Sequence, residues 1–440
     1  MKKNMSEGTV KAAREVAREE AREDANDCGE MQLDIGAAQA SAGHASPAVL
    51  PLDSSFTVEV TGWYRDNRRD LPWRQDKDPY HVWVSEIMLQ QTRVEAVRDY
   101  YQRFMQALPT IEALAEAEEE QLLKLWQGLG YYNRVRNLQK AARQILQNPS
   151  AGNSAEEVSV DPSVTGSTSA IGFASAGFPR TMPEILALPG IGEYTAGAIA
   201  SICFDQRTPA VDGNVLRVMA RLTEEESDVK SAPVKRSFTE LLAGLYPDTG
   251  CGDFTQGLIE LGALVCLPNG QPRCEMCPVS GFCRARAAGR VMELPVKAEK
   301  KARRREQRTV FILSCGGRLA VRRRPKGSLL GNLYEFPQVS QHLTAGAAVS
   351  QAEAWGCHPL DVTRSKQYKH IFSHVEWDMT GYYITCGFEG TGEVSREGAG
   401  DSLQPEGTGE PGGQAFRWVS REQLEEEIPL PSAFQPFCPD

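Results

Sequence analysis

The stretch LALPGIGEYTAGAIASICFDQRTPAVDGNVLRVMARL, residues 186–222, decides the fold of this chain. Gly190 and Gly192 are separated by one apolar residue, which lets the backbone turn sharply and point several N–H groups outward before a helix begins. Such a turn is suited to holding a phosphate. The apolar spacing predicts that helix, and a second helix is predicted from Gly213 to Leu222.

Asp212 lies directly before the second predicted helix. Asp is a favoured N-cap residue, so capping by itself explains an acid at this position. An acid close to a phosphate-holding turn is also a candidate for catalysis. From the residue type alone, the structural and the catalytic interpretations of Asp212 both stay open.

The apolar content and the charge are those expected of a soluble protein. With 440 residues, the chain is long enough for roughly two or three domains with their own cores. No uninterrupted apolar run has the length that a membrane-spanning helix needs. The N-terminal segment is rich in acids and lacks an apolar stretch, which argues against a secretory signal or a transit peptide. We therefore expect a cytoplasmic protein, associated with the nucleoid if the source is bacterial.

The net charge of −10 disfavours a nucleic-acid partner for the chain as a whole. The charge is unevenly distributed, however, because Lys and Arg dominate residues 294–326 against only Glu299 and Glu306. This basic segment is compatible with DNA binding and equally with a solvated linker.

Two further segments of the first half carry candidate residues. One helix is predicted from Val82 to about Met105, and Glu86 falls within its apolar run, where a carboxyl pKa could be raised. The alternative is a Glu on the solvated side of the helix. After a predicted helix over residues 118–126, the turn around Tyr131 and Tyr132 either presents an aromatic ring to a base or packs both rings into the core.

Four cysteines follow the predicted helix over residues 256–265. Two residues separate the second from the third and five the third from the fourth, while seven separate the first from the second. Because a cytoplasmic protein is expected, metal ligation is favoured over disulfides. A thiolate tetrad holds either zinc or a 4Fe-4S cluster, and the spacing leaves both open. The four residues are Cys266, Cys274, Cys277 and Cys283.

The C-terminal part alternates short strand patterns with Gly-rich turns, and helices are predicted near residues 345–355 and 421–427. The domain organisation is therefore a charged, disordered extension over residues 1–53, an all-α domain over 54–286, a basic linker over 287–308 and an α+β domain over 309–440. Ser/Gly-rich or Gly/Glu/Pro-rich sequence predicts flexible insertions over 148–177 and 389–414.

The motifs LPGIG, VDGNV, SEIMLQQT and GLGYY together resemble the helix-hairpin-helix DNA glycosylase superfamily, which includes endonuclease III and the MutY-type adenine DNA glycosylases. The resemblance implies an all-α helix-hairpin-helix domain with an iron-sulfur cluster loop over 266–283. The 4Fe-4S cluster is then favoured over zinc. The family normally has six residues between the first two cysteines, where this chain has seven.

The resemblance also implies a role for each matching residue. Glu86 becomes the proton donor and Asp212 the carboxylate that serves the cleaved sugar, with Tyr194 and Asn214 as hydrogen-bonding support for the sugar and Asp212. The residues expected to contact DNA are Gln91, Tyr131, Gly190, Gly192 and Arg273, and those expected to form an adenine pocket are Arg69, Leu71, Trp73, Arg74 and Glu260.

LLGNLYEFP and the surrounding strand pattern resemble the smaller Nudix-like domain that MutY-type proteins carry. The catalytic Nudix sequence is not apparent, so recognition is expected and pyrophosphatase chemistry is not. The resemblance assigns Phe372, Ser373 and His374 to inspection of 8-oxoguanine, since the Ser and His can hydrogen-bond a base edge and the Phe can stack.

The resemblance implies a monomeric adenine DNA glycosylase of base excision repair, acting on A:8-oxoguanine or A:G mispairs in duplex DNA. The main rival is an endonuclease III-like enzyme, whose lyase lysine would occupy the position of Tyr194. A phenol cannot form a Schiff base, so a monofunctional glycosylase is predicted. A second rival is a non-catalytic DNA-binding protein, and the presence of both Glu86 and Asp212 counts against it.

Overall fold

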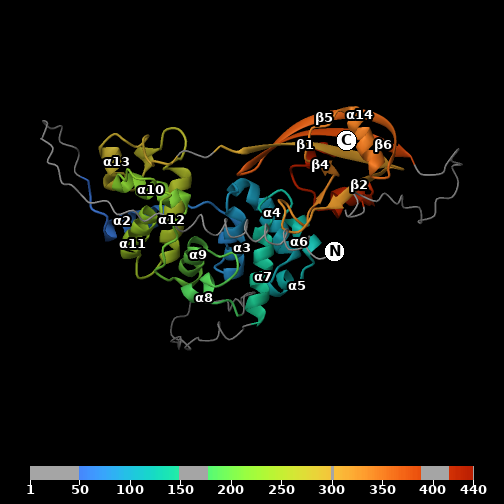
Figure 1. Cartoon of the computed structure of the whole chain (residues 1–440). Coiled ribbons are helices and arrows are strands. Elements are labelled where there is room, and N and C mark those ends of the chain that lie inside the picture. Colours follow the sequence, from blue (N-terminus) through green and yellow to red (C-terminus); the bar gives the residue numbers. More distant parts are fainter. Residues whose placement is uncertain (1–48, 148–176, 299–301, 388–415, 440) are drawn as a thin grey trace, which may run out of the picture. The chain divides into compact units, whose positions relative to one another are not determined.

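The computed structural model of the chain describes residues 49–147, 177–298, 302–387 and 416–439 (Figure 1). Nearly all of the predicted N-terminal extension and of the two predicted flexible insertions lies outside the described residues. An all-α part comes first and a smaller α+β part follows, so the predicted fold class is confirmed. Within the described ranges, no helix combines the length and the apolar character needed to cross a membrane.

The all-α part holds two large apolar clusters and a small third one at Ala285, Val291 and Leu294. The first lies among α3 to α9 and includes Trp83, Phe104 and Trp126, while the second joins α2 to α10–α12 around Phe254 and Met219. The described helices are α2 (Ser54–Asn67), α3 (Pro79–Leu89), α4 (Val94–Ala107), α5 (Ile111–Glu116), α6 (Glu119–Leu125), α7 (Asn133–Gln147), α8 (Met182–Leu186), α9 (Glu193–Phe204), α10 (Gly213–Thr223), α11 (Ala232–Leu245), α12 (Cys251–Leu264) and α13 (Arg284–Ala287), with short 3₁₀ turns η1 (Pro72–Arg74), η3 (Cys274–Met276) and η4 (Ser280–Phe282).

The prediction of one helix from Val82 to about Met105 is wrong. The chain forms two helices, α3 and α4, separated by a turn in which Gln91 has a φ of 60°. This left-handed conformation interrupts an α-helix. Both helices bury apolar residues in the same cluster, so the apolar spacing continues across the break and does not reveal it. At this turn the Arg134 side chain donates hydrogen bonds to the carbonyl oxygens of Ile87, Met88 and Gln90.

The α+β part is built on a seven-stranded sheet with the order β3-β2-β1-β6-β5, to which β4 and β7 are attached. Strands β1 and β6 are parallel, and β6 forms a long antiparallel hairpin with β5 (Figure 1). The elements are β1 (Arg304–Cys315), β2 (Arg318–Arg323), β3 (Tyr334–Glu335), β4 (Gln338–Val339), α14 (Ala345–Ala354), β5 (His358–Ile371), β6 (Val375–Gly387), β7 (Arg417–Val419), α15 (Arg421–Glu426) and η5 (Gln435–Phe437).

Two strands, β1 and β5, differ from the sequence prediction. Strand β1 begins at Arg304, so the end of the predicted linker over 287–308 belongs to the sheet. Strand β5 was not predicted as a strand at all. In both segments most side chains are exposed, and alternation of apolar and polar residues is absent. Pairing with β6 holds them in place, and such backbone pairing leaves no apolar pattern in the sequence.

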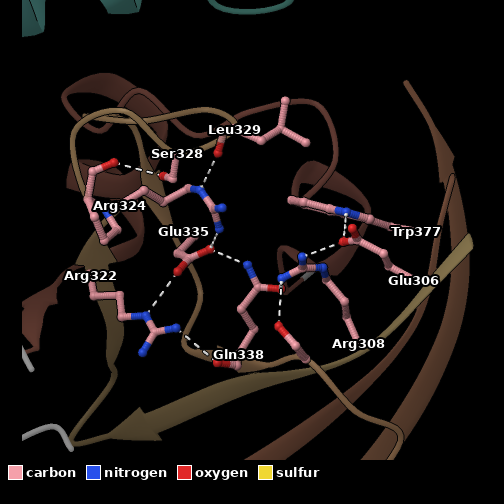
Figure 2. A network of polar contacts seen from close by, with 11 residues as sticks. Glu306, Arg308, Arg322, Arg324, Ser328, Leu329, Glu335, Gln338 and Trp377 are labelled. Atoms are coloured by element: carbon pink, nitrogen blue, oxygen red, sulfur yellow. Dashed lines mark hydrogen bonds and ion pairs between the residues drawn. The ribbon is translucent and has the colours of Figure 1, made fainter. Parts of the chain in front are cut away.

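A buried polar network joins β2, β3 and β4 (Figure 2). The Glu335 carboxylate, 2% exposed, accepts hydrogen bonds from the Arg322 Nε at 2.9 Å, from Arg324 and from Gln338. Every carboxylate oxygen of Glu335 is therefore occupied by a partner within the domain. A buried charge paired in this way has a structural role.

Candidate active site

A cavity of about 510 Å³ opens in the all-α part and brings together side chains from η1, α3, α9, α10 and α12. It is large enough for a nucleobase and part of a sugar. Glu86 and Asp212, which are far apart in the sequence, both line it. The other predicted site residues on its wall are Arg69, Leu71, Trp73, Arg74, Gln91, Tyr194 and Asn214.

Glu86 lies on the buried face of α3 and is 8% exposed, so the solvated alternative does not apply. Burial is the main cause that raises the pKa of its carboxyl, to about 7, and the nearby Asp212 charge adds to this effect. The Tyr194 hydroxyl donates a hydrogen bond of 2.6 Å to the Glu86 Oε2. A carboxyl with a pKa near neutrality can exchange a proton at physiological pH.

Tyr194 therefore has a different partner from the predicted one. It was expected to support Asp212 and the sugar, but its hydroxyl donates to Glu86. Burial raises the pKa of Tyr194 well above its usual value, and the neighbouring Glu86 and Asp212 charges raise it further. The phenol is therefore a hydrogen-bond donor that keeps its proton.

Asp212 is both the N-cap of α10 and a wall residue of the cavity, so the two interpretations are compatible. One carboxylate oxygen accepts from the backbone N–H groups of Asn214 at 2.9 Å and Val215 at 2.8 Å. The other accepts from the Asn214 Nδ2 at 2.8 Å. Burial raises the pKa of Asp212, and these hydrogen bonds oppose the rise because they favour the ionised form.

Glu260 does not line the cavity, although it was expected in the adenine pocket. It is fully buried behind the wall and binds the two arginines that do line it. The Arg69 Nε and Nη2 lie 2.7 and 2.9 Å from its two oxygens, and the Arg74 Nη2 lies 3.0 Å away. Burial by itself would raise the pKa of Glu260, but these bonds lower it to about 2. Glu260 thus holds both guanidinium groups in position.

Gln91 and Tyr131 share an uncommon backbone conformation, with φ values of 60° and 48°. Non-glycine residues in this region cost about 1 to 3 kcal/mol each and are found mostly at functional sites. Tyr131 is 49% exposed, whereas Tyr132 is buried, so one ring is presented and the other packs into the core. The Tyr131 hydroxyl forms a hydrogen bond with the Ser373 hydroxyl.

The glycines of the LPGIG turn connect α8 to α9. Gly190 has a φ of 79°, and a β-carbon there would lie 2.6 Å from the Asn137 Cβ, so only glycine fits without a shift. Gly192 is the N-cap of α9. The turn therefore ends at a helix N-terminus, where backbone N–H groups and the helix dipole favour an anion.

Residues 84–243 match the HhH-GPD superfamily of base excision DNA repair proteins. The adenine DNA glycosylase of Rattus norvegicus is 35% identical over 391 residues, which cover 75% of this chain and 70% of that protein. The adenine DNA glycosylase of Buchnera aphidicola subsp. Schizaphis graminum is 30% identical over 283 residues, 64% of this chain and 74% of that protein. The chain belongs to the adenine DNA glycosylase family.

It is therefore a hydrolytic DNA N-glycosylase. The C-terminal part matches the NUDIX domain over residues 309–438. Among solved structures, that of a thermostable thymine-DNA glycosylase covers 52% of this chain and 94% of its own, with 26% sequence identity and a TM-score of 0.43.

In this adenine DNA glycosylase family member, Phe372, Ser373 and His374 form the tip of the β5–β6 hairpin. Ser373 and His374 are exposed, as recognition of a base edge requires. Phe372 instead packs against Trp377, with ring centroids 4.8 Å apart. The Trp377 Nε1 donates to Glu306, and Arg308 lies 4.2 Å from the ring centroid (Figure 2). The tip is thereby anchored to the sheet.

The four cysteines of the tetrad are unpaired thiols in the segment that follows α12. Burial is the main cause that raises the pKa of Cys277 to about 12, and the charges of Cys266, Cys283 and Cys274 contribute to the rise. The Arg221 Nη1 lies 3.2 Å from the Cys266 Sγ. Across the described ranges no group of metal-ligating side chains forms a closed site. Four thiols are the donor type that zinc and 4Fe-4S clusters take in proteins.

Several wall residues of the cavity were not predicted from the sequence, among them Ser85, Gln90 and Gln256. Gln256 precedes Glu260 by one helical turn on α12, so a helical-face argument could have found it. Gln90 contacts the cavity because the helix breaks there, and no local pattern indicates that break.

Proposed function

We propose that this protein hydrolyses the N-glycosidic bond of adenine mispaired with 8-oxoguanine or guanine in duplex DNA, as the first step of base excision repair. One observation carries the proposal: Glu86, with a pKa raised to about 7, and the capped carboxylate Asp212 line the same cavity. Because their environments differ, Glu86 can act as a protonated acid while Asp212 acts as an ionised carboxylate.

The chemistry begins with extrusion of the adenine nucleotide from the stack into the cavity, because the bond cannot be reached inside a duplex. The protonated Glu86 donates its proton to a ring nitrogen of adenine, which makes the base a better leaving group. The sugar develops positive charge as the bond breaks, and the ionised Asp212 stabilises that charge. Water then adds to the sugar, and Glu86 takes up the proton that the water releases.

The surrounding residues hold the substrate. Arg69, Leu71, Trp73 and Arg74 surround the adenine, and Glu260 orients the two arginines. The N–H groups at Gly190 and Gly192 and the exposed Arg273 side chain bind backbone phosphates. Gln91 and Tyr131 fill the gap that the extruded nucleotide leaves. Asn214 holds Asp212 in its ionised form through the 2.8 Å bond.

The C-terminal domain supplies recognition of the opposite base. Ser373 and His374 at the exposed hairpin tip have hydrogen-bonding groups that can contact the edge of 8-oxoguanine. Phe372 supports the tip through Trp377 and is not free to stack on a base. The DNA partner is thus a mispaired duplex, bound by a monomer.

Adenine release from three duplexes tests this function. We expect fast single-turnover release from a duplex with adenine opposite 8-oxoguanine, slower release opposite guanine, and none from a thymine-glycol duplex. Strand nicking and borohydride trapping should both be absent, because Tyr194 replaces the lysine that a Schiff base requires. Excision of thymine glycol with nicking would mean an endonuclease III-like activity, and tight binding without release would mean a non-catalytic binder.

The rate of release should fall as the pH rises above about 7. Glu86 acts as an acid, its pKa is raised to about 7, and the protonated fraction therefore declines tenfold per unit at higher pH. The measurement is kcat/KM for release from the 8-oxoguanine duplex between pH 5.5 and 9 at constant ionic strength. A rate that keeps rising above pH 8 would rule out Glu86 as the proton donor.

We further propose that Cys266, Cys274, Cys277 and Cys283 hold a 4Fe-4S cluster. These four cysteines would hold the cluster, which would cross-link the loop between α12 and α13 and would thereby keep Arg273 in place for phosphate contact. The Arg221 guanidinium, next to the Cys266 sulfur, complements the negative charge of thiolate ligands.

Protein purified without air should be brown, because iron-sulfur charge transfer absorbs visible light and d¹⁰ zinc does not. Cys274→Ser should lose this absorption and bound iron, whereas Cys438→Ser, outside the tetrad, should keep both. If the protein is colourless and contains one equivalent of zinc, the tetrad is a zinc site and the cluster proposal is wrong.

A further inference from the structure

The Arg134 side chain connects the two turns that carry Gln91 and Tyr131. Its Nη1 lies 2.7 Å from the Ile87 carbonyl oxygen, 3.1 Å from that of Met88 and 2.7 Å from that of Gln90. Its Nη2 lies 2.9 Å from the Leu129 carbonyl oxygen and 3.0 Å from that of Gly130. One guanidinium group thus satisfies carbonyl groups from both turns.

Two of these bonds act directly on the unusual residues. A peptide unit is planar, so fixing the Gln90 carbonyl fixes the plane that leads into Gln91. In the same way, the bond to the Gly130 carbonyl fixes the plane that leads into Tyr131. Both residues have a positive φ, a conformation that persists only where the surroundings hold it. Arg134 supplies that hold at both positions.

The location of Arg134 is costly for the fold by itself. It belongs to the first turn of α7, where a positive charge opposes the helix dipole and no acidic residue compensates. Its Nε is buried without a hydrogen-bond partner. The guanidinium also lies over the rings of Trp126 and Tyr131, at 5.2 and 5.7 Å from their centroids. The bonds to the carbonyl groups of the two turns and the contacts with these rings offset the cost, so Arg134 is retained for what it does at the two turns and not for the stability of α7.

We propose that Arg134 is a positioning residue that sets Gln91 and Tyr131 jointly in the geometry needed to replace the extruded adenine in the stack. The inference rests on the proposed stack-filling role of these two residues. A lysine cannot substitute, because one ammonium nitrogen cannot span carbonyl groups on two turns. Arg134 does not itself line the cavity and contacts its wall only at the Gln90 carbonyl oxygen, away from Glu86 and Asp212.

A fluorescence experiment tests the positioning role. The duplex carries 8-oxoguanine opposite an adenine nucleotide with a 2′-fluoro sugar, which resists cleavage because fluorine destabilises positive charge on the sugar. A 2-aminopurine next to that adenine becomes fluorescent when its stacking partner leaves. At saturating protein, Arg134→Lys should give about half or less of the parental fluorescence rise, because misplaced residues no longer keep the stack open.

Single-turnover adenine release supplies the second readout, on the same duplex with an ordinary sugar. At saturating enzyme, and per active site, Arg134→Lys should be slower by about 10- to 100-fold, the usual effect of small misplacement. The matched control is Arg143→Lys on the same helix, whose Nε makes one 2.8 Å bond to the Ala115 carbonyl. It should keep the parental fluorescence and rate. Normalising to active sites removes any loss of folded protein, and Arg134→Gln provides a second variant.

The possible outcomes separate the inference from the function on which it rests. Parental fluorescence with Arg134→Lys overturns the inference if Gln91→Ala and Tyr131→Ala do lower the fluorescence. If neither alanine variant changes it, the stack-filling role fails and the inference fails with it. A slower release with unchanged fluorescence would mean a general structural role and also overturns the inference.

Discussion

Glu86→Gln should abolish adenine release while leaving DNA binding nearly intact. The amide has the shape of the carboxyl group and can still accept the Tyr194 hydrogen bond of 2.6 Å, so the cavity should keep its form. It has no acidic proton to donate, and general acid catalysis contributes about 10²- to 10⁴-fold. The Glu86 carboxylate also accepts the proton that the attacking water releases, so the measured loss of rate should lie at or above the upper end of that range.

The measurement is single-turnover release from the A:8-oxoguanine duplex at saturating enzyme, with binding followed separately. Glu240→Gln is the matched control, because it makes the same chemical change on the exposed side of α11. Its rate should equal the parental rate. Release by Glu86→Gln within tenfold of the parent would show that another group protonates the base.

Asp212→Asn should produce the second large loss, of about 10²- to 10³-fold, because the negative charge that stabilises the developing sugar cation is removed. The asparagine oxygen can still accept the N–H groups of Asn214 and Val215, so the cap of α10 should largely persist. The second oxygen becomes an amide that faces the Asn214 amide, which replaces a 2.8 Å hydrogen bond by two opposed donors. A modest fall in melting temperature should accompany the loss of rate.

Asp53→Asn separates the two effects, since Asp53 caps α2 through Ser55 and lies outside the cavity. It should affect melting temperature only, and the rate should stay at the parental value. If Asp212→Asn lowers the rate no more than its folded fraction declines, capping is the whole role of Asp212.

The candidate catalytic residues could be singled out from the sequence because the signals that mark them are local, and the family resemblance supplied the roles proposed for them. A turn with two glycines, an acid before a helix and an acid within an apolar run depend on neighbours within a few residues. The cysteine spacing is equally local. The structure places Glu86 and Asp212 on one cavity and Tyr131 at the surface with Tyr132 in the core.

Other features depend on partners that are distant in the chain, and the sequence did not reveal these partners. Tyr194 donates to Glu86, 108 residues away, and Glu260 binds Arg69, 191 residues away, behind the cavity wall. Strand β5 exists because β6 pairs with it, not because its own residues form an apolar stripe.

The sequence by itself determined the helical hairpin, the two carboxyl groups, the thiol tetrad and the order of the two domains, because short-range spacing and backbone preference specify them. Only the tertiary structure decided where α3 ends and how Gln91 and Tyr131 are oriented. Arg134 stabilises the end of α3 and these two turns with hydrogen bonds, among them bonds to carbonyl groups more than 40 residues earlier in the chain. Every residue carries the same backbone carbonyl group, so the residue types do not indicate which carbonyl groups a distant side chain will bind.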